Sequence, residues 1–168
     1  KKGTLDRPYT GLADCAVRTV KEDENGWRAL WKGNFVLKGI MHPEDAIRAH
    51  SLGVDGIMVS NHGARQLDTA PATIDTLPAI ADAVAGRAEI ILDSGVRRGS
   101  DIVKALALGA NAVALGRAYL YGLGAGGERG VKRALEIMDS ELRRTMALCG
   151  RASLSGLTRD LIFKRTLP

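Results

Sequence analysis

Two hydrophobic textures alternate along the chain from Asn34 onward. Short, almost wholly apolar runs predict buried strands at 34–39, 55–60, 88–95 and 111–116. Segments with apolar residues three or four positions apart predict helices at 43–53, from about 71 through 85, at 100–108, and from after 127 to about 148. Strands that alternate with helices indicate a parallel sheet covered by helices.

Part of this pattern repeats. Residues 43–60 and 99–116 align as helix, glycine stop and strand, with Gly53 over Gly109. A repeated unit of this kind favours a TIM barrel over a doubly wound sheet, and such a barrel has eight strands. We therefore expect an α/β fold, the C-terminal half of a TIM (β/α)8 barrel with about four parallel strands. Because open edges are a liability, a missing half, a partner chain or a dimer is expected to cover them.

Composition narrows the class of protein. The 168 residues carry a net charge of +5 with 4% aromatic residues, and the basic residues are scattered, which argues against a nucleic-acid binder. Cys15 and Cys149 lie far apart and predict free thiols in a reducing compartment. We find no signal peptide and no apolar run of the roughly 18 residues that a membrane-spanning helix needs. The chain opens without methionine, which suggests a fragment or a processed piece.

Polar and glycine residues follow each predicted strand, and in a TIM barrel the active site lies at these strand ends. The first strand end supplies Lys38 and Gly39; the second Ser60, Asn61, His62 and Arg65; the third Asp93, Ser94, Gly95 and Arg97; the fourth Gly116 and Arg117. Each of the four ends carries a cationic side chain, namely Lys38, Arg65, Arg97 or Arg117, so we expect an anionic ligand among them.

The third and fourth ends predict a phosphate site. Glycines before a helix start leave free backbone N–H groups that favour an anion, and Arg97 and Arg117 add charge. The alternative is that the glycines only make tight turns and the arginines are solvated. Arg98 is expected to point elsewhere, into solvent or a salt bridge.

The first two ends predict chemistry at a carboxylate. His62 has the residue type of a base near neutral pH, and Arg65 that of a carboxylate clamp. Lys38 suits an anion or a developing negative charge. The alternatives are that Lys38 is a solvated surface lysine and that His62 is a structural loop histidine. Together they suggest oxidation or proton abstraction beside a carboxylate. The residues alone do not name the cofactor.

Several strings closely resemble the FMN-dependent α-hydroxy acid dehydrogenase and oxidase family, over roughly residues 34–161. They are "LKGI", "SNHGARQLD", "DSGVRRGSDIVKALALGA" and "ALGRAYLYGL". Ser94, the segment "LYGLGAGGERGV" and the tail "SLSGLTRDLI" are most similar to the (S)-mandelate and L-lactate dehydrogenase branch. The resemblance implies an FMN hydroxy acid dehydrogenase domain over 34–168, preceded by a weakly patterned segment 1–33.

That resemblance also implies residue roles. His62 is the base, Arg65 binds the substrate carboxylate, and Lys38 stabilises the reduced flavin. The implied FMN contacts are Lys38, Ser60, Asp93, Ser94, Gly95, Arg97, Gly116 and Arg117. The implied reaction oxidises an (S)-2-hydroxy acid, of lactate or mandelate type, to the 2-oxo acid. A quinone, a cytochrome or oxygen accepts the electrons, and a homo-oligomer in the cytoplasm or at the inner membrane face is expected.

Two departures from the family matter. The family's first four strands are missing, including an aspartate that orients the histidine, and Ala64 replaces the commoner glycine. One alternative is therefore a catalytically incomplete FMN-binding half-barrel fragment that needs a partner or the missing N-terminal half. Another is a phosphate-binding isomerase or lyase without flavin, which the combination of Lys38, His62, Arg65 and Asp93 disfavours.

Overall fold

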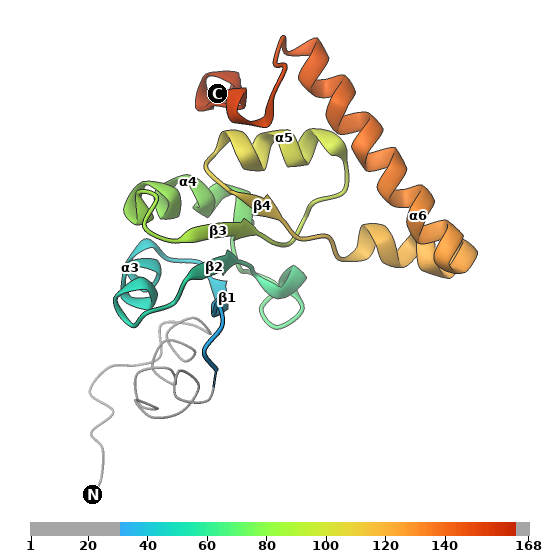
Figure 1. Ribbon diagram of the computed structural model, residues 1–168. Helices are drawn as coiled ribbons and strands as arrows, with labels where there is room; N and C mark the ends of the chain where they lie inside the picture. The colour runs from blue at the N-terminus through green and yellow to red at the C-terminus, as the bar shows by residue number, and fades with distance from the viewer. Residues whose placement is uncertain (1–30, 164–168) are drawn as a thin grey trace, which may run out of the picture.

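The computed structural model describes residues 31–163, so most of the segment 1–33, with Cys15, lies outside the described residues. Its centre is a parallel sheet whose strand order follows the chain (Figure 1). The strands are β1 (Val36–Ile40), β2 (Gly56–Val59), β3 (Glu89–Leu92) and β4 (Ala112–Val113). The predicted parallel βα arrangement is confirmed.

Helices connect and flank the strands. They are α3 (Pro43–Ser51), α4 (Thr73–Val84), α5 (Gly99–Ala107) and α6 (Arg117–Leu148), with short 3-10 turns η1 (His62–Ala64), η2 (Leu154–Gly156) and η3 (Arg159–Leu161). Figure 1 shows α3, α4 and α5 following one another around the sheet, while α6 extends beside α5. Cys149, just after α6, is an exposed free thiol, as predicted.

The two faces of the sheet differ in burial. Leu37, Ile57 and Ile90 lie in register on neighbouring strands and are at most 9% exposed, because they face the helices. On the alternate positions Val36 is 42% exposed and Glu89 is exposed. In a closed barrel the face opposite the helices points inward and is filled by side chains. The described part of the chain leaves this face, and the outer edges of β1 and β4, without a partner strand.

The internal repeat is visible at the helix ends. Gly53 and Gly109 take positive φ angles of 81° and 109°, and the following N–H groups donate to the carbonyls of Ala49 and Ala105, at 3.2 and 3.0 Å. The glycines permit this left-handed stop, which turns each chain segment directly into the next strand. The repeat in the sequence therefore corresponds to the same local structure twice.

The fourth βα unit differs from its prediction. The strand expected over 111–116 is limited to Ala112–Val113, since β4 pairs with β3 alone. The helix expected after Gly127 already begins at Arg117 and is broken at Gly126 and Gly127. Glycine-rich spacing hid the first segment from the sequence analysis.

The glycines of α6 let its two segments approach each other. A Cβ placed on Gly122 would lie 2.5 Å from the carbonyl oxygen of Gly130, so only glycine fits there. The helix from after residue 127 was predicted from apolar residues three or four positions apart; of these, Met138 is buried, whereas Leu135 is 47% exposed. The buried face of this second segment of α6 is thus narrower than the spacing of its apolar residues suggested.

Gly99 fixes the contact between α5 and α6. A Cβ at this position would overlap the backbone nitrogen of Leu142 and lie 2.5 Å from the carbonyl carbon of Glu141. The two backbones therefore touch at the first residue of α5, directly after the end of the loop that follows β3.

We expect Gly99→Ala to destabilise the fold by about 1–3 kcal/mol, because backbone atoms of α6 would have to move. The measurement is the free energy of unfolding in urea. Gly124→Ala is the control: it lies in α6 with nothing near its Cβ, and it should stabilise by about 0.5–1 kcal/mol through helix propensity. Equal stability of the Gly99 variant and the wild type would contradict the close packing.

Candidate active site

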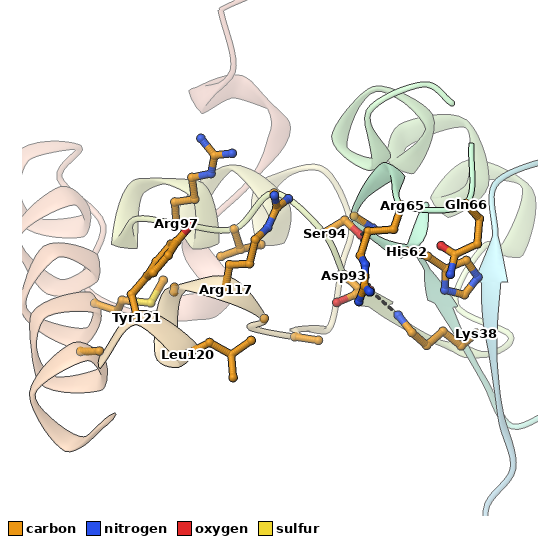
Figure 2. Close-up of a pocket in the computed structure, with 18 of the residues that line it drawn as sticks. Lys38, His62, Arg65, Gln66, Asp93, Ser94, Arg97, Arg117, Leu120 and Tyr121 are labelled. Atoms are coloured by element: carbon orange, nitrogen blue, oxygen red, sulfur yellow. Dashed lines mark hydrogen bonds and ion pairs between the residues drawn. The ribbon is translucent and has the colours of Figure 1, made fainter. Parts of the chain in front are cut away.

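A cavity of about 780 Å³ lies at the carboxyl ends of the strands, between the sheet and α6 (Figure 2). It brings together most of the predicted site residues: Lys38, His62, Arg65, Asp93, Ser94, Gly95, Arg97, Gly116 and Arg117. Figure 2 shows Lys38, His62 and Gln66 at one end, and Arg97, Arg117 and Tyr121 at the other. The cavity therefore joins the predicted catalytic end to the predicted phosphate end.

Three strand ends are tied together by Lys38. Its Nζ forms an ion pair with Asp93 Oδ2 and donates to Ser60 Oγ at 2.7 Å. Ser60 also donates to the same carboxylate oxygen. Because Ser60 is 1% exposed and does not line the cavity, its observed role is to hold these two side chains.

The same network sets the charge of Asp93. Partial burial by itself raises the pKa of a carboxyl group, but hydrogen bonds from Lys38 and Ser60 outweigh it and lower the pKa of Asp93 below its usual value. Asp93 is therefore an anion at neutral pH, and it fixes the Lys38 ammonium at the cavity.

His62 begins a strained turn. His62, Gly63 and Ala64 have φ angles of 55°, 69° and 60°, so three consecutive residues lie in the left-handed region. Polar contacts hold them: His62 N donates to Ser60 Oγ at 3.1 Å, and Gly63 N donates to Ser94 Oγ, also at 3.1 Å. Such strain persists only where surrounding contacts impose it.

The His62 imidazole lies over the end of β1. A Cβ on Gly39 would come 3.1 Å from its Nε2, so the glycine, at a φ of 100°, leaves room for the ring. Within residues 31–163 no side chain or backbone group hydrogen-bonds the imidazole. A base of this kind usually has its tautomer fixed by a second group, and the described part of the chain does not supply one.

Arg97 and Arg117 carry the charge at the other end. Neither guanidinium forms an ion pair with any residue of 31–163, and Arg117 Nη2 lies 3.7 Å from where a Gly63 Cβ would stand. Arg98 instead pairs with Glu141 at 2.6 Å, which confirms the expected salt bridge. At this end of the cavity, Arg97 and Arg117 therefore have no acidic partner among the described residues, whereas Arg98, next to Arg97 in the chain, is paired with Glu141.

The helix starts differ from the prediction. The N–H groups of Arg97 and Arg98 donate to Asp101 Oδ2 at 3.1 and 3.0 Å, so the start of α5 does not offer the free donors that the glycine spacing suggested. By contrast α6 begins after Gly116 with no side-chain cap. Nothing lies within 4 Å of a Cβ on Gly95 or Gly116, which leaves open space beside the two arginines. The start of α6 is the better anion site.

Gln66 and Tyr121 also line the cavity, although neither was predicted as a site residue. Gln66 follows Arg65 directly, and Tyr121 stands one helical turn after Arg117. The position of Tyr121 one turn after Arg117 could not be recognised, because residues 117–125 were not predicted as a helix. Among residues 31–163 no cluster of metal-ligating side chains occurs, and none of their helices is long and apolar enough to cross a membrane.

Comparison with known proteins identifies the family. The family model described as FMN-dependent dehydrogenase matches residues 16–164, and the chain belongs to this family. It is 50% identical over 167 residues to an L-lactate dehydrogenase of Pectobacterium atrosepticum, covering 99% of this chain and 43% of the relative. It is 47% identical over 163 residues to 2-hydroxyacid oxidase 1 of Mus musculus, covering 94% and 44%.

The chain is also similar to solved structures of mandelate oxidase. A mandelate oxidase variant with a monooxide FMN adduct superposes with a TM-score of 0.78 at 44% identity, covering 83% of this chain and 44% of that one. The chain thus spans less than half the length of the relatives it matches. The prediction of half a barrel is confirmed.

The strained turn yields one prediction. Ala64→Gly should stabilise the chain by about 0.5–1 kcal/mol, because glycine removes the left-handed penalty while adding some unfolded-state entropy. Thermal and urea unfolding measure it. Ala83→Gly, inside α4 (Thr73–Val84), is the control and should lose about 0.5–1 kcal/mol, because glycine is unfavourable in a helix interior. A destabilised Ala64 variant would contradict the left-handed geometry.

Asp93 yields a pH prediction. Since its folded pKa is lowered, its contribution to stability is present above the unfolded aspartate value near ~3.9 and is lost as pH falls through the folded pKa. The stability difference between wild type and Asp93→Asn should be constant above about pH 5 and shrink below it. Asp68→Asn, at an exposed position outside this network, is the control for the loss of one carboxylate from the chain. Parallel profiles for wild type and the Asp93 variant would contradict the ion pair.

Proposed function

We propose that this chain forms the C-terminal half of the active site of an FMN-dependent 2-hydroxy acid dehydrogenase or oxidase. The reaction is oxidation of an (S)-2-hydroxy acid of lactate or mandelate type to the 2-oxo acid. One observation carries the proposal: Lys38, His62 and Arg65 share a single cavity with Arg97 and Arg117 at the ends of parallel strands. Family membership and relatives named for lactate, 2-hydroxyacid and mandelate support it. The working unit is proposed to be residues 34–168.

The residues present fit FMN. The phosphate would lie by Arg97, Arg117 and the start of α6. There, neither arginine has an acidic partner within the described range 31–163, no side chain caps the helix, and open space lies beside Gly95 and Gly116. Lys38, held by Asp93, would lie by the ring, and Asp93 and Ser94, which line the cavity, would make further contacts. Ser60, predicted as an FMN contact, would act through its hydrogen bonds to Lys38 and Asp93. FMN, when bound, supplies the two-electron acceptor.

The protein's own residues would orient the substrate and move its proton. Arg65 would hold the carboxylate through paired hydrogen bonds. His62 would then take a proton from the substrate carbon or hydroxyl at its imidazole nitrogen. The Lys38 ammonium would stabilise negative charge that develops nearby, since Asp93 and Ser60 fix its position.

A second candidate function has its own support. The imidazole of His62 has no hydrogen-bond partner within residues 31–163, so the chain alone would bind flavin without rapid turnover. This is the catalytically incomplete half-barrel, which needs a partner or an N-terminal half. The electron acceptor, the homo-oligomer and a location in the cytoplasm or at the inner membrane face stay predictions.

An absorption experiment separates the two. The purified chain is mixed with FMN, desalted, and scanned before and after anaerobic (S)-mandelate or (S)-lactate. Retained bands that bleach indicate a working site, retained bands that persist indicate the incomplete half, and loss of the flavin overturns the proposal. If bleaching occurs, His62→Asn should slow it by about 10²–10⁴-fold with flavin still bound, because the base is removed. His50→Asn, in the last turn of α3 and outside the cavity, is the matched control.

A further inference from the structure

The loop that leads from β3 into α5 carries Gly95 and Arg97 to the cavity, and it must be held in place. Asp101 secures the loop from within α5 by accepting from the N–H groups of Arg97 and Arg98. A second carboxylate secures it from outside. The Oε2 of Glu141, on α6, accepts from Gly99 N at 3.0 Å. The start of α5 is thus occupied by two carboxylates of the chain itself.

Glu141 also holds the side chain of Arg98. Arg98 Nε lies 3.2 and 3.3 Å from the two carboxylate oxygens, and its Nη2 lies 2.6 Å from Oε1. This two-pronged geometry fixes direction as well as distance. Hydrogen bonds from Arg98 and then Gly99 N lower the pKa of Glu141, so the clamp stays ionised at neutral pH. Of two consecutive arginines, one is bound to α6 and the other faces the cavity.

The position of Glu141 links two walls of the cavity. Ala134, Ile137 and Met138, about one or two turns before it on α6, line the cavity opposite the loop. Gly99 lets the backbones of α5 and α6 touch at the same point. A shift of Glu141 would therefore move the loop relative to the wall formed by α6.

We propose that Glu141 is a positioning residue for the phosphate of the bound flavin. Through its bonds to Arg98 and Gly99, Glu141 fixes the loop of Gly95 and Arg97 against α6. It also occupies the start of α5, so that the phosphate is directed to the start of α6. This inference rests on the proposed function. It predicts that loss of the Glu141 charge weakens recognition of the phosphate and spares recognition of the ring.

The test compares FMN with riboflavin, which lacks the phosphate. Dissociation constants are measured by quenching of flavin fluorescence for the wild-type chain and for Glu141→Gln. The affinity for FMN should fall about tenfold, because the loop would no longer be held by the charged hydrogen bonds of Glu141 and Arg97 would be less well placed for the phosphate. The affinity for riboflavin should be unchanged. Glu136→Gln, on the same helix and paired with exposed Arg133, is the control and should alter neither affinity.

The outcomes are separable. Unchanged FMN affinity, or equal losses for FMN and riboflavin, overturns the positioning role, because a merely structural defect would affect both flavins. If Glu141→Gln does not fold, Arg98→Gln breaks the same pair from the loop side and must show the same selective loss. Failure of the wild-type chain to bind FMN at all overturns the proposed function, and this inference with it.

Discussion

The site is organised by the ion pair between Lys38 and Asp93, which spans from β1 to β3 across the end of β2. A parallel sheet places the carboxyl ends of neighbouring strands side by side, so one lysine reaches residues of two further strands. Ser60 stands between the partners and also accepts from His62 N. The position of the ammonium and the start of the histidine turn thus depend on one buried hydroxyl.

The basic residues around the cavity fall into two groups, those with an acidic partner and those without one among residues 31–163. Asp93 neutralises Lys38 in part, and Glu141 withdraws Arg98, whereas Arg97 and Arg117 have no acidic partner within residues 31–163. Unpaired cations beside open space favour a ligand with a concentrated negative charge. The backbone follows the same division, since carboxylates fill the start of α5 and no side chain caps α6. Positive charge is therefore most concentrated at the end of the cavity that holds Arg97 and Arg117, whereas Arg65 is a single cation nearer Lys38 and His62.

Much of this arrangement was predictable from local sequence. Apolar runs ending at Ser60 or Asp93 located the strand ends, and strand order then placed their side chains on one edge. What failed depended on contacts distant in the chain. In the first segment of α6, Gly122 lies against the backbone of Gly130, a contact that helix propensity does not record. The capping of α5 by Glu141 joins residues 42 positions apart, and nothing in "DSGVRRGSD" announces it.

The face of the sheet that residues 31–163 leave uncovered should matter more for proton transfer than for binding of anions. This chain supplies Arg97 and Arg117 toward a phosphate and Arg65 toward a carboxylate, and charge attraction tolerates some freedom of position. Proton transfer is more demanding, because the imidazole must present the correct nitrogen at hydrogen-bond distance. His62 has a fixed backbone, in a turn held by Ser60 and Ser94, but a ring without a hydrogen-bond partner among residues 31–163. The chain covers 43–44% of the two relatives compared above, and in the proposed enzyme it would supply cations for both anions and one wall of the site. The orienting contact would have to come across the uncovered side of the sheet.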